Sequence, residues 1–347
     1  MLQVLLLSGD GFNEFALPCA VATPACTGRE GPTGLVTLLP AYQQLHCCRA
    51  CFELKTREGE WALASPPPAP RSEVPVPAWD VDRPLTLDEA EQRLADAATW
   101  FTSARQSEET RLSFGFMGDS LAVAFHGWLD ERLLKHALTL VASEGIAPHV
   151  WRFRLSGEAE GANGTRAWNI EPLGRGAVFS QLEVLDIEGS QPGDFFRTIV
   201  ASGFDEEGMI ARALARMPRL RRLSVPSAPN EEFFEGPPHP LRELVLQSGY
   251  DTQDFIARLA RTRRFPELEA LDFTDYAETY MDDYAQRRTP PEAFEALLAS
   301  PFLPALRQVV LRGTVLDKVD ARRLKDTLLG RRLSQFDVMP LEPGGEG

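Results

Sequence analysis

The residues best suited to chemistry are five cysteines, which all lie between Cys19 and Cys51 of this 347-residue chain. Cys48 and Cys51 have the two-residue spacing that lets two thiolates bind one metal ion. A structural zinc ion held by Cys19, Cys26, Cys48 and Cys51 is one interpretation, since a small module with few apolar residues needs a staple. A simpler interpretation is that the cysteines are reduced thiols without a metal, because cysteine is a common small buried residue. We therefore expect no cofactor, with structural zinc as the alternative.

A cysteine nucleophile is a third interpretation of the same segment. His46 lies beside Cys47, and either Cys47 or Cys51 could attack a substrate with a histidine as base. No acid that would orient such a histidine is identifiable, so we do not expect a catalytic cysteine. The odd number of cysteines and the N-terminus, which lacks the positive flank of a signal peptide, predict a cytoplasmic protein with reduced thiols. No stretch approaches the ~18 consecutive apolar residues of a membrane span.

Ser120 is the other candidate nucleophile. It lies in the tetrapeptide Gly118-Asp-Ser-Leu121, which follows an apolar segment and resembles the first block of the GDSL hydrolases. That resemblance also implies a downstream Asp-x-x-His motif that supplies the base. No aspartate stands three residues before the candidate histidines His126, His136, His149 and His239. We therefore interpret the tetrapeptide as a hairpin turn and expect no catalytic residue in this chain.

The elements around these residues predict several regions. Residues 1–64 form a Cys-containing N-terminal module, and the prolines of 65–85 predict an extended connector because each fixes φ and removes a donor. Residues 86–177 predict an α/β region. Its expected elements are a helix over 87–104 with a Thr86–Glu89 capping box, a hairpin of strands at 112–116 and 121–125, a helix from Asp130 to a left-handed Gly145, and a strand over 151–155.

Residues 178–340 contain a repeated apolar spacing. Leu182-Glu-Val-Leu185-Asp-Ile187 fits the pattern L-x-x-L-x-L, which recurs with conservative changes from Leu220, Leu241, Leu268, Leu306 and Leu333. The segments between these strands are helical by period, as at 255–259 and 294–298. Neither a short strand nor its helix can bury an apolar face alone, so the alternation predicts stacked strand-helix units.

This pattern resembles the leucine-rich repeat family, in the strand-plus-helix form of ribonuclease-inhibitor-like proteins. The resemblance implies an α/β fold: a short, irregular solenoid over 178–340 with a concave parallel sheet and outer helices, capped by 86–177 and followed by a flexible tail at 341–347. The family's Asn or Cys, eight residues after the first Leu, is missing. Those positions hold Ser190, Ala228, Gly249, Tyr276, Thr314 and Leu341, so the side-chain ladder that ties successive turns is absent.

The concave side of such a sheet is the first candidate binding surface. Side chains alternate across a strand, so the residues between the repeated leucines are expected to be exposed. We predict that the partner contacts Asp186, Glu188, Arg222, Glu243, Asp272 and Arg312. A second candidate is the acidic, Tyr-rich loop 275–284, whose predicted contacts are Tyr276, Tyr280, Asp282, Asp283 and Tyr284, with Tyr250 nearby. The alternative for this loop is a solvated segment whose rings pack on the repeats.

Charge and site chemistry define the expected function. The chain has 50 acidic and 36 basic residues, and this net charge of −14 argues against nucleic acid as a partner. The concave residues include no histidine, cysteine or lysine, which a binding surface does not need. We expect a non-enzymatic scaffold or adaptor for a protein partner, with a basic protein as one candidate. Two alternatives are an inhibitor or immunity protein that binds a basic enzyme, and an N-terminal module with zinc-dependent or hydrolytic activity.

Overall fold

The computed structural model describes residues 2–6, 20–21, 23, 26, 33–39, 43–63, 74–105, 110–127, 131–157, 166–190, 197–202, 205–275, 284–327 and 330–340. The chain forms two compact units, Met1–Val76 and Pro77–Gly347. Their boundary lies within the Pro-rich segment 65–85 that the sequence marks as a connector. Within the described residues, no helix has the length and apolar character needed to cross a membrane.

The first unit is a four-stranded sheet with one helix. Its strands lie in the order β3-β2-β1-β4, antiparallel except for the parallel β1–β4 pair. The bounds are β1 Leu2–Leu6, β2 Thr33–Leu39, β3 Gln43–Cys48, β4 Trp61–Leu63 and α1 Arg49–Arg57. Since α1 starts at the residue after β3, the Cys47-Cys48 pair lies at a strand end and Cys51 in the first turn of a helix. The buried side chains described here are Cys47, Cys48, Cys51, Phe52 and Trp61.

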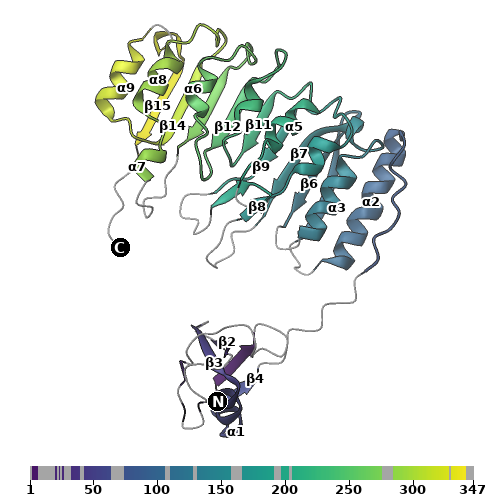
Figure 1. Ribbon diagram of the computed structural model, residues 1–347. Coiled ribbons are helices and arrows are strands. Elements are labelled where there is room, and N and C mark those ends of the chain that lie inside the picture. The colour runs from purple at the N-terminus through teal and green to yellow at the C-terminus, as the bar shows by residue number, and fades with distance from the viewer. Residues whose placement is uncertain are drawn as a thin grey trace. The chain divides into compact units, whose positions relative to one another are not determined.

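The second unit is built on a nine-stranded, open sheet in the order β15-β14-β13-β12-β11-β9-β7-β6-β5 (Figure 1). All neighbours are parallel except the β5–β6 hairpin. The bounds are β5 Arg111–Met117, β6 Ser120–His126, β7 Val150–Ser156, β9 Val184–Ile187, β11 Arg222–Val225, β12 Glu243–Gln247, β13 Ala270–Thr274, β14 Gln308–Thr314 and β15 Gln335–Pro340. A separate parallel pair joins β8 Arg166–Trp168 and β10 Thr198–Val200.

The helices of this unit cover one face of the sheet. Each strand of the large sheet lies beside the strand that precedes it within that sheet, so right-handed crossovers that advance in one direction place their helices on the same side. Ile210 and Leu214 of α5 line one apolar space with Leu185 and Leu223, and Phe255 of α6 stacks on a β13 ring. The helices are α2 Leu87–Ala104, α3 Glu131–Val141, α4 Glu171–Arg175, α5 Met209–Ala215, α6 Phe255–Leu259, α7 Tyr284–Arg287, α8 Pro291–Leu298 and α9 Lys318–Lys325, with short 3₁₀ turns η1 Ala147–His149, η2 Glu231–Phe234 and η3 Gly330–Arg332.

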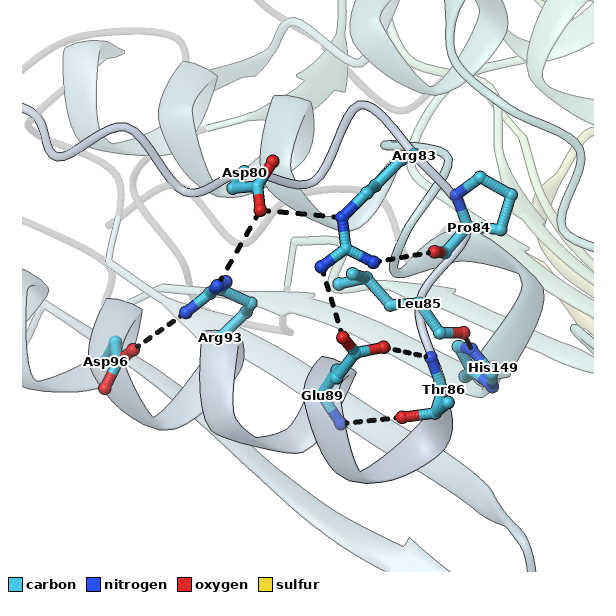
Figure 2. A network of polar contacts seen from close by, with 9 residues as sticks. All are labelled: Asp80, Arg83, Pro84, Leu85, Thr86, Glu89, Arg93, Asp96 and His149. Carbon is cyan, nitrogen blue, oxygen red and sulfur yellow. Dashed lines mark hydrogen bonds and ion pairs between the residues drawn. The ribbon is translucent and has the colours of Figure 1, made fainter.

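The start of α2 is fixed by a local polar network (Figure 2). The Thr86 hydroxyl accepts from the Glu89 N–H at 3.2 Å, and the Glu89 carboxylate accepts from the Thr86 N–H at 2.8 Å. This is the predicted capping box, which satisfies two donors that the first helical turn leaves open. Arg83 donates to the same Glu89 carboxylate, and His149 lies 2.8 Å from the Leu85 carbonyl oxygen. The entry of the chain into α2 is thus anchored on both sides.

Gly145 corrects one sequence-based expectation. The α3 helix ends at Val141, and Gly145 does not have the positive φ expected of a left-handed helix terminus. It is required instead for close packing, because a Cβ at this position would lie 2.7 Å from Leu85 Cδ1 and 3.0 Å from the Arg83 carbonyl oxygen. The Gly145 N–H donates to the Val81 carbonyl at 2.8 Å. The glycine therefore joins α3 to the segment that precedes α2.

Candidate functional site

The side of the unit-two sheet opposite the helices carries no described helix, and we call it the open face. Along β12 and β13 buried residues beneath the helices alternate with half-buried residues that lie on this side. The open face consists of Arg152, Arg154, Val184, Asp186, Arg222, Ser224, Glu243, Val245, Gln247, Ala270, Asp272, Thr274, Gln308, Val310, Arg312, Gln335, Asp337 and Met339. Of these repeat-strand positions, Arg222, Gln308, Gln335 and Met339 are exposed, and the others are half-buried.

Four of the predicted contact residues are ion-paired neighbours on the open face. Arg222 on β11 lies 2.9 Å from the Glu243 carboxylate on β12. Arg312 on β14 meets Asp272 on β13 through two parallel hydrogen bonds, Nε–Oδ1 and Nη2–Oδ2, each 2.9 Å long. Paired charges of this kind fix the direction of long side chains and present ordered donors and acceptors at the surface.

Two arginines that sequence reasoning missed extend the open face beyond the repeats. Arg152 and Arg154 of β7 lie 3.6 Å and 4.0 Å from the carboxylate of Asp186 on β9. The signal was present in the alternation Trp151-Arg-Phe-Arg-Leu155, which places both arginines on one side of a strand. It went unused because β7 precedes the first repeat, and only the β7–β9 pairing makes the two surfaces continuous.

A side-chain bridge orders the C-terminal ends of the strands. The Gln247 amide accepts from the Ser190 N–H at 2.9 Å and donates to the Ser190 carbonyl at 2.8 Å, across the intervening strand β11. Glu188, a predicted contact, is half-buried beside this loop, and its N–H donates to the Leu155 carbonyl oxygen. The bridge holds the loop after β9 against β12, where no ladder of repeated Asn or Cys side chains exists.

The acidic, Tyr-rich loop is anchored at its base. Asp275 is 1 % exposed, and its carboxylate accepts from the N–H and hydroxyl groups of Thr289. The carboxylate of Asp275, the first acidic residue of the loop, is therefore buried and hydrogen-bonded within the protein. Tyr250 is half-buried, with the Arg197 guanidinium 5.9 Å from its ring centre. The predicted contacts Tyr276, Tyr280, Asp282 and Asp283 lie outside the described residues. The side chain of Tyr284, at the start of α7, also lies outside the described part of the structure.

A charged groove of about 660 Å³ lies at the N-terminal ends of β12, β13 and β14. Arg242 lines it and is 3.2 Å from Glu267 and 3.7 Å from Glu269. The groove is lined by Arg242, Glu243, Glu269, Ala270, Ala305, Arg307 and Gln308. Its permanently charged guanidinium groups and exposed carboxylates suit polar recognition better than proton transfer, which needs a group that titrates near neutral pH.

Three of the four predicted metal ligands converge in the first unit. The sulfur atoms of Cys26, Cys48 and Cys51 all lie within 4.8 Å of one another. Cys48 and Cys51 are buried and Cys26 is half-buried. Cys19, the fourth predicted ligand, lies outside the described residues. We call the three converging residues the thiol cluster.

The described surroundings of Ser120 and Cys51 do not activate either group as a nucleophile. The Ser120 hydroxyl donates to the Gln181 side-chain oxygen at 2.7 Å, and His126 lies at the opposite end of the same strand, beside Ser156. A strand advances about 3.3 Å per residue, which separates Ser120 from His126 by ~20 Å. Burial raises the pKa of the Cys51 thiol to about 12, so the metal-free thiol is protonated and weakly nucleophilic at neutral pH.

The fold and its surfaces define an α/β protein with a large, open, mostly parallel sheet. Comparison with known protein families, with curated proteins and with solved structures found no match to this chain.

Proposed function

We propose that this protein is a non-enzymatic scaffold or adaptor that binds a protein partner on the open face, in the manner of a short, irregular leucine-rich repeat solenoid. The single observation that carries the proposal is the register of the repeats. The second apolar residue of each L-x-x-L-x-L segment lies opposite its counterpart on the next strand, through Leu185, Leu223, Leu244, Leu271, Val309 and Phe336. The residues that lie between these apolar residues on each strand therefore form continuous rows across the open face.

The backbone at the start of each repeat supports the same proposal. The Arg221 carbonyl accepts from the N–H groups of Arg242 and Glu243, at 2.8 and 2.9 Å. The Arg242 carbonyl accepts in the same way from Glu269 and the residue after it. Equivalent paired bonds are made to the carbonyls of Glu183, Glu269 and Arg307. A contact that recurs at every step is what stacked, equivalent units produce.

The charge of the open face narrows the class of partner. The arginines are Arg152, Arg154, Arg222 and Arg312, and the carboxylates are Asp186, Glu243, Asp272 and Asp337, with Glu188 at the margin. The net charge of the open face is therefore close to zero, although the whole chain is strongly acidic. A partner with its own mixed pattern of charges fits this face better than a uniformly basic one. The alternative of an inhibitor of a basic enzyme depends instead on loop 275–284.

The test is affinity capture with the full chain and two matched variants. The open-face variant carries Arg222→Ala, Glu243→Ala and Asp272→Ala. The control variant carries Glu231→Ala, Arg258→Ala and Glu295→Ala, which change exposed charges on η2, α6 and α8. We expect the open-face variant to bind the captured protein at least tenfold more weakly, about 1.4 kcal/mol, and the control to bind like wild type.

Equal binding by the wild type and a folded open-face variant would exclude the open face as the contact surface. A third variant, Tyr276→Ala with Tyr280→Ala and Tyr284→Ala, then separates the two surfaces. Loss of binding in that variant alone assigns the partner to loop 275–284, and a steep fall of affinity with salt would identify a basic partner.

A further inference from the structure

The sulfur atoms of the thiol cluster have the spacing of ligands around one metal ion. The Cys26 and Cys48 sulfurs are 4.0 Å apart, and all three sulfurs lie within 4.8 Å of one another. A disulfide would require about 2.05 Å. Zinc–sulfur bonds of ~2.3 Å at tetrahedral angles place two thiolates ~3.8 Å apart. The observed separations are therefore close to those that a bound ion would impose.

The three thiols come from different elements and point to one place. Cys26 ends a turn in which its N–H donates to the Thr23 carbonyl at 2.8 Å. Cys48 is the last residue of β3 and the N-cap of α1, where it makes no side-chain capping bond. Cys51 lies in the first turn of α1, with its sulfur 3.0 Å from the Thr23 hydroxyl. Cys26 is distant in sequence from the other two, so packing of one element alone does not explain their convergence.

The position at the start of α1 partly offsets the cost of burying thiolate ligands. The first turn of a helix carries open N–H donors and partial positive charge, which stabilise negative sulfur. The first turn of α1 contains no acidic residue whose carboxylate would interact with this partial positive charge. Cys48 and Cys51 have the spacing that lets both sulfurs approach one ion from the helix start.

We propose that Cys26, Cys48 and Cys51 supply, as thiolates, three of the four ligands of a zinc ion that has a structural role in the first unit. Three soft sulfur ligands select zinc over magnesium or calcium, which prefer oxygen. The ion ties the turn at Cys26 to the junction of β3 and α1. That junction contains most of the described core of the unit, where cysteines stand beside Phe52 and Trp61. A small core of this kind gains stability from a metal staple.

The experiment uses the full chain, purified under reducing conditions without added metal. Elemental analysis is expected to find a single zinc ion per chain. After removal of zinc with a chelator, Co²⁺ is added as a spectroscopic probe. Sulfur-to-cobalt charge-transfer bands and intense d–d bands of a tetrahedral site are expected. Wild-type protein that binds neither metal, or gives a cobalt spectrum without thiolate bands, would overturn the proposal without recourse to any variant.

Single substitutions then assign the ligands. Cys26→Ser, Cys48→Ser and Cys51→Ser are each expected to lower zinc content and to weaken the charge-transfer bands. The matched control is Cys47→Ser, which alters an adjacent buried cysteine that is not part of the thiol cluster. The control is expected to keep both signals. Retention of zinc and of an unchanged spectrum by Cys26→Ser would reduce the site to the Cys48–Cys51 pair and contradict the three-thiolate site. Equal loss in Cys47→Ser would attribute the signals to general disruption of the core.

Discussion

Arg312 and Asp272 face each other on adjacent strands of the open face and form a bidentate ion pair, with both nitrogen–oxygen distances at 2.9 Å. Both side chains are partly exposed, so solvent screens their attraction. Each residue was predicted from sequence as a separate partner contact. If the open face binds a partner as proposed, their pairing presents one bidentate unit to it, and a change in either residue also alters the other.

The pair is expected to contribute little to folding. Arg312→Ala and Asp272→Ala should each lower the free energy of unfolding by ~1 kcal/mol or less, with a coupling of about 0.2–1 kcal/mol in the double variant. Urea unfolding of the four proteins measures both values. A coupling well above this range would mean that the pair is a structural element of the sheet rather than an available recognition unit.

Gln247 is expected to matter more for stability than the open-face charges do. Gln247→Ala removes the partner of both the N–H and the carbonyl group of Ser190. The loss should lower the free energy of unfolding by roughly 1–3 kcal/mol. Gln308→Ala, at an exposed position on the same face, is the control and should change it by about 0.5 kcal/mol or less. Chemical denaturation of both variants compares them; similar small effects would show that water replaces the Gln247 bonds.

Gly145 and Gly118 should respond differently to asparagine, which tolerates positive φ better than most residues. Gly118 has φ +60°, and a Cβ added there would have no neighbouring atom within 4 Å, so Gly118→Asn should be nearly neutral. Gly145→Asn should cost about 1–3 kcal/mol, because its Cβ would overlap Leu85 and the Arg83 carbonyl. Thermal and urea unfolding test the contrast. A neutral Gly145→Asn would mean that the segment before α2 moves aside at little cost.

The lowered pKa of His239 predicts that mild acidification reduces the stability of the protein. Burial lowers its pKa, and the nearby Arg264 guanidinium acts in the same direction, while a hydrogen bond to the Met217 carbonyl oxygen opposes them. The unfolded chain therefore binds a proton more readily than the folded protein below the ordinary histidine pKa of about 6.5. Stability is fully present above that value and falls as the pH drops toward the lowered folded pKa.

The measurement is urea unfolding between about pH 7.5 and 5.5, a range that lies above ordinary carboxylate pKa values. His239 should add a slope of up to ~1.4 kcal/mol per pH unit. His239→Gln keeps a donor for the Met217 carbonyl but does not titrate, so its stability should vary less with pH. Identical pH profiles for the two proteins would contradict the assigned role of His239.

Local features of this protein were predictable because their causes lie within a few residues. The Thr86–Glu89 capping box places the start of α2, and the alternation around Phe114 and Val123 places the β5–β6 hairpin. The L-x-x-L-x-L spacing likewise predicts the strands of the repeats and the side chains that they expose. Each of these depends on periodicity, capping or turn chemistry, which sequence alone displays.

Contacts between distant segments required the tertiary structure. Neither the Ser190–Gln247 bridge nor the junction of Asp186 with Arg152 follows from spacing, because both depend on which strands pair and in which register. Gly145 shows the same limit, since its need for glycine comes from Leu85 across the fold and not from its own backbone angles.

The repeated strands, the rows of residues between their leucines and the cysteines that could bind metal were predictable from sequence alone, because residue type and period set local conformation and the face of each side chain. The convergence of Cys26 with Cys48 and Cys51, and the ion pairs Arg222–Glu243 and Arg312–Asp272, are seen only in the folded structure. These contacts join residues that are far apart in the sequence, so the packing of whole helices and strands sets the distance between their side chains.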